Sequence, residues 1–153
     1  MKRMLGFLLG FLLLTTPAWA ETVKIPVAAA FTGQLASFGE GIKNGALLKA
    51  EEINRAGGIN GKKVEVVLED ELCDPKEAAT VATKLANDPE VSVVVGHLCS
   101  SATLAALPVY RDAKLPAISP ASTNVSIGKM SPYYFRNVYK DDFQGLFLAR
   151  YAD

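Results

Sequence analysis

Two short polar segments carry hydroxyl side chains that could bind a small ligand, and each follows an apolar run of the chain. The first contains Ser100 and Ser101, and the second contains Ser119, Ser122 and Thr123. Hydroxyl groups, together with the free backbone N–H groups at the start of a helix, bind anions such as a carboxylate. Neither segment contains Lys or Arg. We therefore expect a ligand without net charge, such as a zwitterion, held by dipoles and hydroxyl groups.

A purely structural role for these residues is the competing interpretation. Ser, Thr and Asn are the ordinary residues of helix caps and turns, so each one taken singly is more often a cap than a ligand contact. Two hydroxyl segments at successive strand ends favour binding. His97 is the only histidine, and a lone histidine beside a disulfide is more often a packing or hydrogen-bonding residue than a catalyst.

An enzyme has little support in this sequence. It contains no GxSxG motif, no P-loop and no GxGxxG after a predicted strand, which are the commonest local signatures of hydrolase and nucleotide chemistry. A serine hydrolase built on Ser100 and His97 would also need an orienting acid. We therefore predict a protein that is not an enzyme, with no cofactor and no metal site.

The first twenty residues have the three parts of a secretory signal peptide: the bases Lys2 and Arg3, an apolar run over 5–14, and small residues ending at Ala20. A helix needs roughly twenty apolar residues to cross a bilayer, so an uncleaved anchor is the weaker interpretation. We predict cleavage after Ala20 and a periplasmic location. No cysteine follows directly, which argues against a lipid-anchored form.

The composition after cleavage describes an ordinary folded domain. Loss of Lys2 and Arg3 leaves 14 bases against 16 acids and a net charge of −2, and half of the residues are apolar. This balance does not attract nucleic acid or anionic lipid. A single incomplete lobe and a monomer are expected.

Two cysteines remain in a chain addressed to an oxidising compartment, Cys73 and Cys99. A single disulfide between them is the expected arrangement. The chain-entropy model gives such a bond about 3.5 kcal/mol of stabilisation. A redox motif and a zinc site have less support, because there is no CxxC and no second Cys or His pair.

Apolar runs and helical periodicities alternate along the chain. Strands are predicted at 23–30, 62–70, 91–96, 115–119 and 133–138, and helices at 42–56, 74–86, 101–113 and from Asp141 or Asp142 onward. This order predicts an α/β fold with a largely parallel sheet and helices on both faces. Ligands of such sheets bind outside the carboxyl ends of the strands, where both hydroxyl segments would lie.

Four local features carry sharper predictions. Asp74 and Pro75 form the best helix start in the chain, as cap and first helical residue. Pro26 has no N–H to donate, so the first strand should either expose one N–H position or contain an irregularity. Pro108 should either kink the third helix or mark its start. The valine-rich segment 91–96 is typical of a strand that is buried on both faces.

Four motifs resemble the periplasmic Leu/Ile/Val-binding proteins of branched-chain amino acid ABC transporters. They are GHLCSSAT at 96–103, SPASTN at 119–124, INRAGGINGKKVEVV at 53–67 and DELCDPKEA at 70–78. The resemblance covers the whole chain after residue 20. It implies the periplasmic binding protein type 1 fold, in which two hinged lobes close on a ligand.

The resemblance also implies a set of site residues. Ser100 and Thr123 would hold the carboxylate and ammonium groups of an amino acid, and Ala121 and Ser122 would supply main-chain contacts. The paired loop cysteines of the family correspond to Cys73 and Cys99.

Two further residues, Leu98 and Phe38, match positions that line the side-chain pocket. The family often has Tyr or Trp in place of Phe38, which leaves the identity of the bound side chain open.

The implied organisation is a signal peptide at 1–20, an incomplete N-terminal lobe at 21–140 and the start of a second lobe at 141–153. The acidic residue that binds the ammonium group in the family lies in the second lobe. The sequence is expected to be either a fragment of a longer protein or a truncated gene product.

The leading hypothesis is therefore capture of an aliphatic, branched-chain amino acid for delivery to the membrane permease of an ABC transporter. One alternative is a binding protein of the same fold for another small solute, such as an amide, urea or an aromatic acid. Another is the ligand-binding domain of a sensory receptor.

Overall fold

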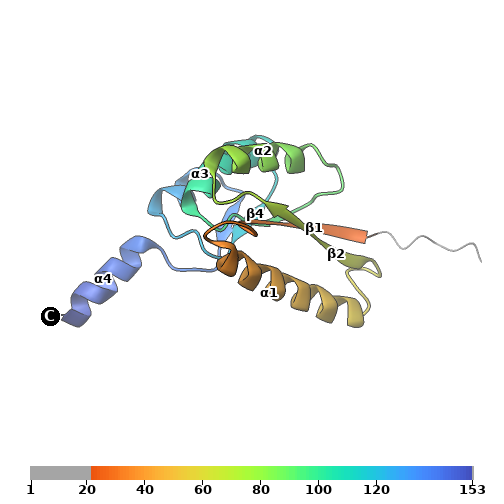
Figure 1. The fold of residues 1–153 in the computed structure, drawn as a ribbon, viewed down its shortest axis with the longest axis horizontal. Coiled ribbons are helices and arrows are strands. Elements are labelled where there is room, and N and C mark those ends of the chain that lie inside the picture. The colour runs from red at the N-terminus through yellow and green to blue at the C-terminus, as the bar shows by residue number, and fades with distance from the viewer. Residues whose placement is uncertain (1–21, 153) are drawn as a thin grey trace, which may run out of the picture.

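A computed structural model of the protein describes residues 22–152 (Figure 1). The predicted signal peptide and its cleavage site lie outside these residues. Five parallel strands form one sheet in the order β2-β1-β3-β4-β5. Their bounds are Thr22–Ala29 for β1, Lys63–Asp70 for β2, Val94–Gly96 for β3, Ala117–Ser119 for β4 and Tyr134–Arg136 for β5.

Helices lie on both faces of the sheet, which confirms the predicted fold class (Figure 1). Helix α1 covers one face, and α2 and α3 pack side by side on the other. A 3₁₀ helix, η1, and a projecting helix, α4, follow. Their bounds are Ala36–Arg55 for α1, Pro75–Ala86 for α2, Ser100–Asp112 for α3, Val125–Lys129 for η1 and Asp141–Ala152 for α4.

The main hydrophobic core lies between the sheet and the helices α2 and α3. Each of these helices presents small and branched apolar residues to the sheet, and β1, β3, β4 and β5 supply the opposite wall. Its buried members include Ala28, Val81, Ala82, Leu85, Val94, Ala106, Leu107, Tyr110, Ala117, Ile127 and Tyr134. Alanine at several of the contact positions lets the backbones of the two layers approach closely.

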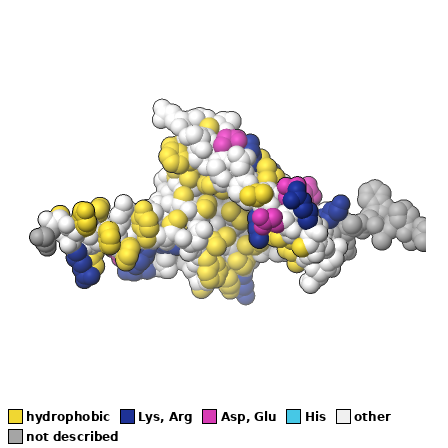
Figure 2. Space-filling view, turned by 90° about the horizontal axis from the view of Figure 1, so that it is seen from below, with side chains coloured by type: hydrophobic (Ala, Val, Ile, Leu, Met, Phe, Trp, Pro, Cys, Tyr) yellow, Lys and Arg dark blue, Asp and Glu magenta, His cyan; other side chains and the backbone are white. Residues whose placement is uncertain are grey.

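The opposite face is less completely covered, contrary to the expectation for segment 91–96. Helix α1 packs on β1 and β2, so Val95 of β3 is only half-buried. Ile118 of β4 and Phe135 of β5 are 37% and 56% exposed. Figure 2, which views the molecule from this side, shows hydrophobic side chains in the middle of the face and along α4.

The first helix begins at Ala36 rather than at the predicted residue 42. Gly39 and Gly41 led to the assignment of a loop, but Gly39 is helical and has a packing role. A Cβ atom at Gly39 would lie 1.9 Å from the carbonyl oxygen of Ala30. Glycine is therefore required for the first turn of α1 to approach the end of β1.

The proline in β1 lies opposite an irregularity, as predicted. Lys24 pairs with Val91, and Val27 pairs with Val95. Three residue steps along β1 therefore lie opposite four steps along the segment that leads into β3. Pro26 falls within this interval. The regular part of β3 therefore begins only at Val94, later than the sequence indicated.

The predicted helix start at Asp74 is confirmed, because its carboxylate accepts hydrogen bonds from the backbone N–H groups of Lys76 and Glu77 at 2.8 and 3.1 Å. Pro108 lies inside α3, which begins eight residues earlier at Ser100, so Pro108 does not mark a helix start.

Substitution of two glycines of α1 tests the close approach. Gly39→Ala should lower the free energy of unfolding by about 1–3 kcal/mol, since the added methyl group has no room. Gly45→Ala, at a position with no atom within 4 Å of the added Cβ, should raise it by about 0.5–1 kcal/mol because alanine favours a helix. Urea-induced unfolding measures both changes. Equal stability of the two variants would contradict the packing role of Gly39.

Candidate functional site

In the sheet, β2 lies on one side of β1 and β3 lies on the other, so the strand order reverses direction between β1 and β3. Loops that leave the carboxyl ends of such a pair diverge to opposite sides and leave a crevice, where ligands of open α/β sheets bind. Both hydroxyl segments emerge at this edge, after β3 and after β4. The topology thus confirms that they are neighbours.

A direct hydrogen bond joins the two segments. The backbone N–H of Asn124 donates to Oγ of Ser100 at 3.3 Å. Ser100 is the first residue of α3, so its hydroxyl group lies beside the N–H groups of the first helical turn. The positive end of the helix dipole adds to their attraction for an anion. Ser100, Ala121 and Thr123 are all partly exposed at this edge.

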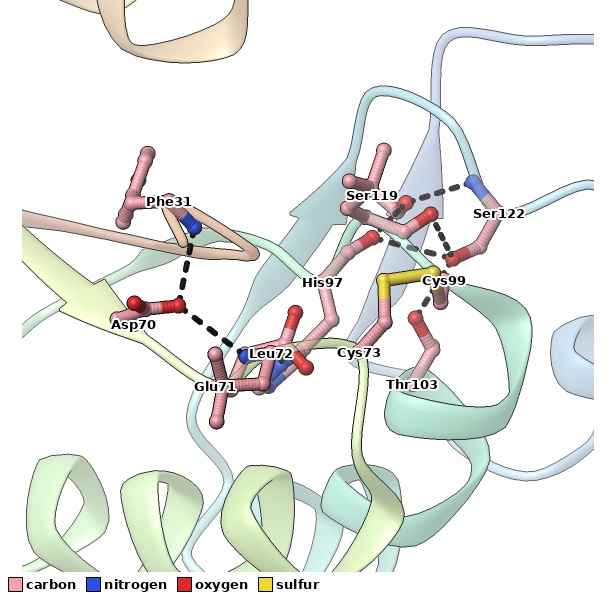
Figure 3. The surroundings of a disulfide bond; sticks show 11 residues. Phe31, Asp70, Glu71, Leu72, Cys73, His97, Cys99, Thr103, Ser119 and Ser122 are labelled. Carbon is pink, nitrogen blue, oxygen red and sulfur yellow. Dashed lines mark hydrogen bonds and ion pairs between the residues drawn. A yellow bond between two sulfur atoms is a disulfide. The ribbon is translucent and has the colours of Figure 1, made fainter. Parts of the chain in front are cut away.

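The other serines of the second segment are buried and serve the structure (Figure 3). Ser119 and Ser122 both donate to the carbonyl oxygen of His97, at 2.6 and 3.1 Å. Ser122 also shares a hydrogen bond of 2.7 Å with Thr103. These side chains tie the loop after β4 to the loop after β3.

Main-chain groups of the second segment are also engaged. The N–H groups of Ala121 and Ser122 both donate to Oγ of Ser119, at 3.2 and 2.9 Å. A ligand contact from either residue would therefore be made by a carbonyl oxygen or would displace one of these bonds.

A cation reaches this segment from another part of the chain. Nη1 of Arg136, at the end of β5, donates to the carbonyl oxygens of Ser122 and Asn124 at 3.0 Å each. The sequence alone did not predict a role for Arg136, because this residue lies outside both hydroxyl segments. An arginine at the carboxyl end of a predicted strand was the available signal.

The two residues expected to line a side-chain pocket lie in different surroundings. Leu98 is buried in a small apolar cluster with Ala29 and Ala30, against which Ala121 packs. Phe38 is 63% exposed and lines a groove of about 480 Å³ on the α1 side, together with residues that include Pro120 and Asn137. The groove thus touches the second hydroxyl segment through Pro120.

Cys73 and Cys99 form the predicted disulfide, with their Cα atoms 5.4 Å apart (Figure 3). It joins the loop after β2 to the start of α3. Leu72 and Cys73 both have left-handed backbone angles, with φ of 54° and 58°. Such angles are unfavourable for residues other than glycine, so the cross-link holds a strained segment in place.

Asp70 stabilises the same rim. Its carboxylate accepts hydrogen bonds from the N–H groups of Phe31 and Leu72, at 2.9 and 3.2 Å (Figure 3). It also accepts one from the Thr32 hydroxyl at 2.6 Å. Burial alone would raise the pKa of Asp70, but these hydrogen bonds outweigh it and lower the pKa. A charged Asp70 therefore fixes the loop after β1 to the loop after β2.

A fully buried polar group lies behind the disulfide. Nε2 of His97 is 3.0 Å from the Tyr110 hydroxyl, and its Nδ1 is 3.8 Å from Oε1 of Glu71. Burial raises the pKa of Tyr110, and the charge of Glu71 acts in the same direction. His97 is thus a buried hydrogen-bonding residue, as expected from its position. Glu71 is buried and Asp74 is a helix cap, so these two carboxylates do not form an exposed pair.

The sequence of the described fold matches a known family. The model of the periplasmic binding protein family matches residues 22–152. The chain belongs to the periplasmic binding protein family. This match covers every strand and helix described above.

Individual relatives are similar over the same region. An amino acid binding protein of Pseudomonas aeruginosa is 45% identical over 139 residues, which are 90% of this chain and 37% of the relative. A leucine-, isoleucine-, valine-, threonine- and alanine-binding protein of the same species is 42% identical over 140 residues, 88% of this chain and 37% of the relative. The chain spans little more than a third of the length of these relatives.

A solved structure shares the fold. The branched-chain amino acid transporter substrate binding protein LivJ of Streptococcus pneumoniae, in complex with isoleucine, superimposes with a TM-score of 0.80 and 40% identity. The superposition covers 86% of this chain and 38% of that one. These relatives are binding proteins rather than enzymes.

Residues 22–152 contain neither a membrane-spanning helix nor a cluster of metal ligands. No helix in this range is both long and apolar enough to span a membrane, and no three His, Cys, Asp or Glu side chains in it are grouped to hold a metal ion.

Replacement of Asp70 by Asn should weaken the rim. An amide cannot accept all three hydrogen bonds, so Asp70→Asn should lower the free energy of unfolding at pH 7 by about 1 kcal/mol, a small value because the group is partly exposed. The folded-state pKa is lowered, so the stabilisation is present above the unfolded pKa of about 3.9 and is lost as the pH falls through the folded pKa.

Urea unfolding between about pH 7 and pH 2.5 therefore measures a stability difference between the wild type and Asp70→Asn that shrinks below about pH 4. Asp112→Asn is the matched control, because Asp112 is exposed and pairs only with the adjacent Arg111 among the interactions of the described residues. A difference independent of pH would contradict the role of the charged carboxylate.

Proposed function

We propose that this chain forms the first ligand-binding lobe of an exported solute-binding protein, which captures a branched-chain amino acid and delivers it to the membrane permease of an ABC transporter. The hydrogen bond between the Asn124 N–H and Ser100 is the observation that carries the proposal. It joins the hydroxyl segments after β3 and β4 at the carboxyl edge of the sheet, and β3 borders the point where the strand order reverses.

The chemistry of this edge suits the carboxylate of an amino acid. It can accept hydrogen bonds from the N–H groups at the start of α3 and from the Ser100 hydroxyl. The hydroxyl and the backbone N–H of Thr123 can also donate to it. Charge-assisted hydrogen bonds of this kind are stronger than neutral ones. Because Arg136 is already bonded to two carbonyl oxygens, the ligand carboxylate is held by neutral donors, which also suits a net-neutral zwitterion.

The other predicted site residues have roles in the same proposal. Leu98 and Phe38 contribute the apolar part of the site, and Ala121 and Ser122 contribute main-chain contacts. The apolar cluster at Leu98 and the groove at Phe38 support an aliphatic side chain. The relatives named above support amino acid binding, since their names specify an amino acid or branched-chain amino acids.

The proposed organisation has a first lobe up to about residue 140 and a second lobe from residue 141. Helix α4 begins at Asp141, and no residue of this helix is buried, which supports its assignment to a different lobe. Its apolar residues Phe143, Leu146 and Phe147 would pack within that lobe. The protein is proposed to act in the periplasm as a monomer without catalytic activity.

Removal of single hydroxyl groups tests the ligand site. Ser100→Ala and Thr123→Ala should each weaken binding of L-leucine by roughly ten- to a hundredfold, since each removes a hydrogen bond to a charged group. Ser101→Ala is the matched control, because Ser101 is the next residue of α3 and is exposed. Isothermal titration calorimetry measures the affinities, and circular dichroism checks the fold.

The ligand panel should include L-isoleucine, L-valine, an aliphatic amide, urea and 4-hydroxybenzoate. Preference for one of the last three compounds would show that this protein binds another small solute rather than an amino acid. Unchanged affinity for leucine in both Ser100→Ala and Thr123→Ala would remove the two segments from the site.

A further inference from the structure

The guanidinium group of Arg136 is fixed at the back of the second hydroxyl segment. One nitrogen, Nη1, bonds to the carbonyl oxygens of Ser122 and Asn124 at 3.0 Å each. The group also stacks over the ring of Tyr134, with Cζ 5.4 Å from the ring centroid. The backbone of Gly128 in η1 closes the other side, since a Cβ there would lie 3.3 Å from Nη2. Arg136 therefore has little freedom to move.

The carbonyl oxygen of Thr123, which lies between those of Ser122 and Asn124, also accepts a hydrogen bond. The N–H of Asp141, at the start of α4, donates to the oxygen of Thr123 at 3.1 Å. Three consecutive carbonyl groups thus face the segment 136–141. Two of them depend on one side chain.

The orientation of the carbonyl groups decides the orientation of the N–H groups. A trans peptide is planar, so its N–H points opposite to its C=O. The peptide between Thr123 and Asn124 illustrates this, because its oxygen meets Asp141 while its N–H donates to Ser100. By the same geometry the N–H of Thr123 points away from Arg136.

We propose that Arg136 is a positioning residue, which sets the conformation of residues 122–124 and so presents Thr123 and Ser100 to the ligand. The inference rests on the proposed function for its ligand, but the effect on the loop is independent of any ligand. Without the cation, the oxygens of Ser122 and Asn124 lose their shared donor and the segment can turn.

Two substitutions of Arg136 separate its parts. Arg136→Met removes the charge and both hydrogen bonds while keeping an unbranched apolar stem. Arg136→Lys keeps the charge, but an ammonium group lacks the planar fork and the ring stacking of a guanidinium. Arg111→Met is the matched control, because Arg111 is exposed on α3 and pairs with its neighbour Asp112 at 2.9 Å.

The first measurement is amide hydrogen exchange by NMR without ligand. The N–H groups of Asn124 and Asp141 report on the segment, since the first donates from it to Ser100 and the second donates to the carbonyl oxygen of Thr123. Loss of the hydrogen bonds to a charged group should make both exchange about tenfold faster or more in Arg136→Met. Arg136→Lys should lie between this variant and the wild type, and Arg111→Met should match the wild type.

The second measurement is titration with L-leucine, followed by the chemical shifts of the same amides. The apparent dissociation constant should rise about tenfold or more in Arg136→Met, less in Arg136→Lys and not in Arg111→Met. Unchanged exchange of Asn124 and Asp141 in both Arg136 variants would overturn the proposal. Faster exchange with unchanged affinity would also overturn it, since the conformation would then not matter for the ligand.

Two remaining outcomes are distinguishable. If the wild type binds no solute of the panel, the proposed function fails, while the exchange rates still decide whether Arg136 sets the loop. If Arg136→Met does not fold, Arg136→Lys decides by the exchange of the same two amides.

Discussion

A buried hydroxyl group, that of Ser119, joins the carboxyl ends of two strands, and the geometry of the whole rim depends on it. Ser119 donates to the carbonyl oxygen of His97 and accepts from the N–H groups of Ala121 and Ser122. One side chain thus fixes the loop after β3 relative to the loop after β4. A hydroxyl can do this because it donates and accepts at once, and burial protects its bonds from water. The position of Ser100 beside residue 124 follows from this link.

The other loops of the rim are held by a covalent bond, by hydrogen bonds or by close backbone contacts. The disulfide joins the loop after β2 to α3, and the Asp70 carboxylate joins it to the loop after β1. Close approaches at Gly39 and Gly96 bring backbone segments together where a Cβ would meet a carbonyl oxygen at 1.9 and 2.4 Å. All of these lie at the carboxyl end of the sheet. Such concentration is typical of a binding edge, where the positions of donors must be fixed before a ligand arrives.

Two charged side chains near this edge, Arg136 and Glu71, are bonded to the backbone or buried rather than exposed to a ligand. Arg136 is bonded to main-chain oxygens, and Glu71 is buried under the disulfide beside His97. The partly exposed groups of the two hydroxyl segments are hydroxyl and main-chain groups, and the exposed carboxylate of Asp70 is bonded to the loops after β1 and β2. An edge of this kind suits a ligand whose own charges cancel, because an exposed cation or anion would favour ligands of one sign. The apolar cluster around Leu98 adds a region without polar groups.

Periodicity and local chemistry in the sequence were sufficient for the fold class, the five strands, the start of α2 at Asp74 and the disulfide. These features depend on neighbours in the chain or on the only two cysteines. The sequence also located both hydroxyl segments at strand ends. It did not separate Ser119 and Ser122, which are buried, from Ser100 and Thr123, which are partly exposed, since all four are hydroxyl residues of loops.

Other features were decided only by the tertiary structure. The early start of α1 at Ala36 depends on the contact of Gly39 with Ala30, nine residues earlier. The role of Asp70 depends on Phe31 and Thr32, which lie 39 and 38 residues earlier. The role of Arg136 depends on Ser122 and Asn124, which lie 14 and 12 residues earlier. The strand order determines such contacts, because a parallel sheet brings the carboxyl ends of distant strands to one edge. A pattern read along the chain records which residues have donors and acceptors, but the partner of each is set by the packing of the sheet.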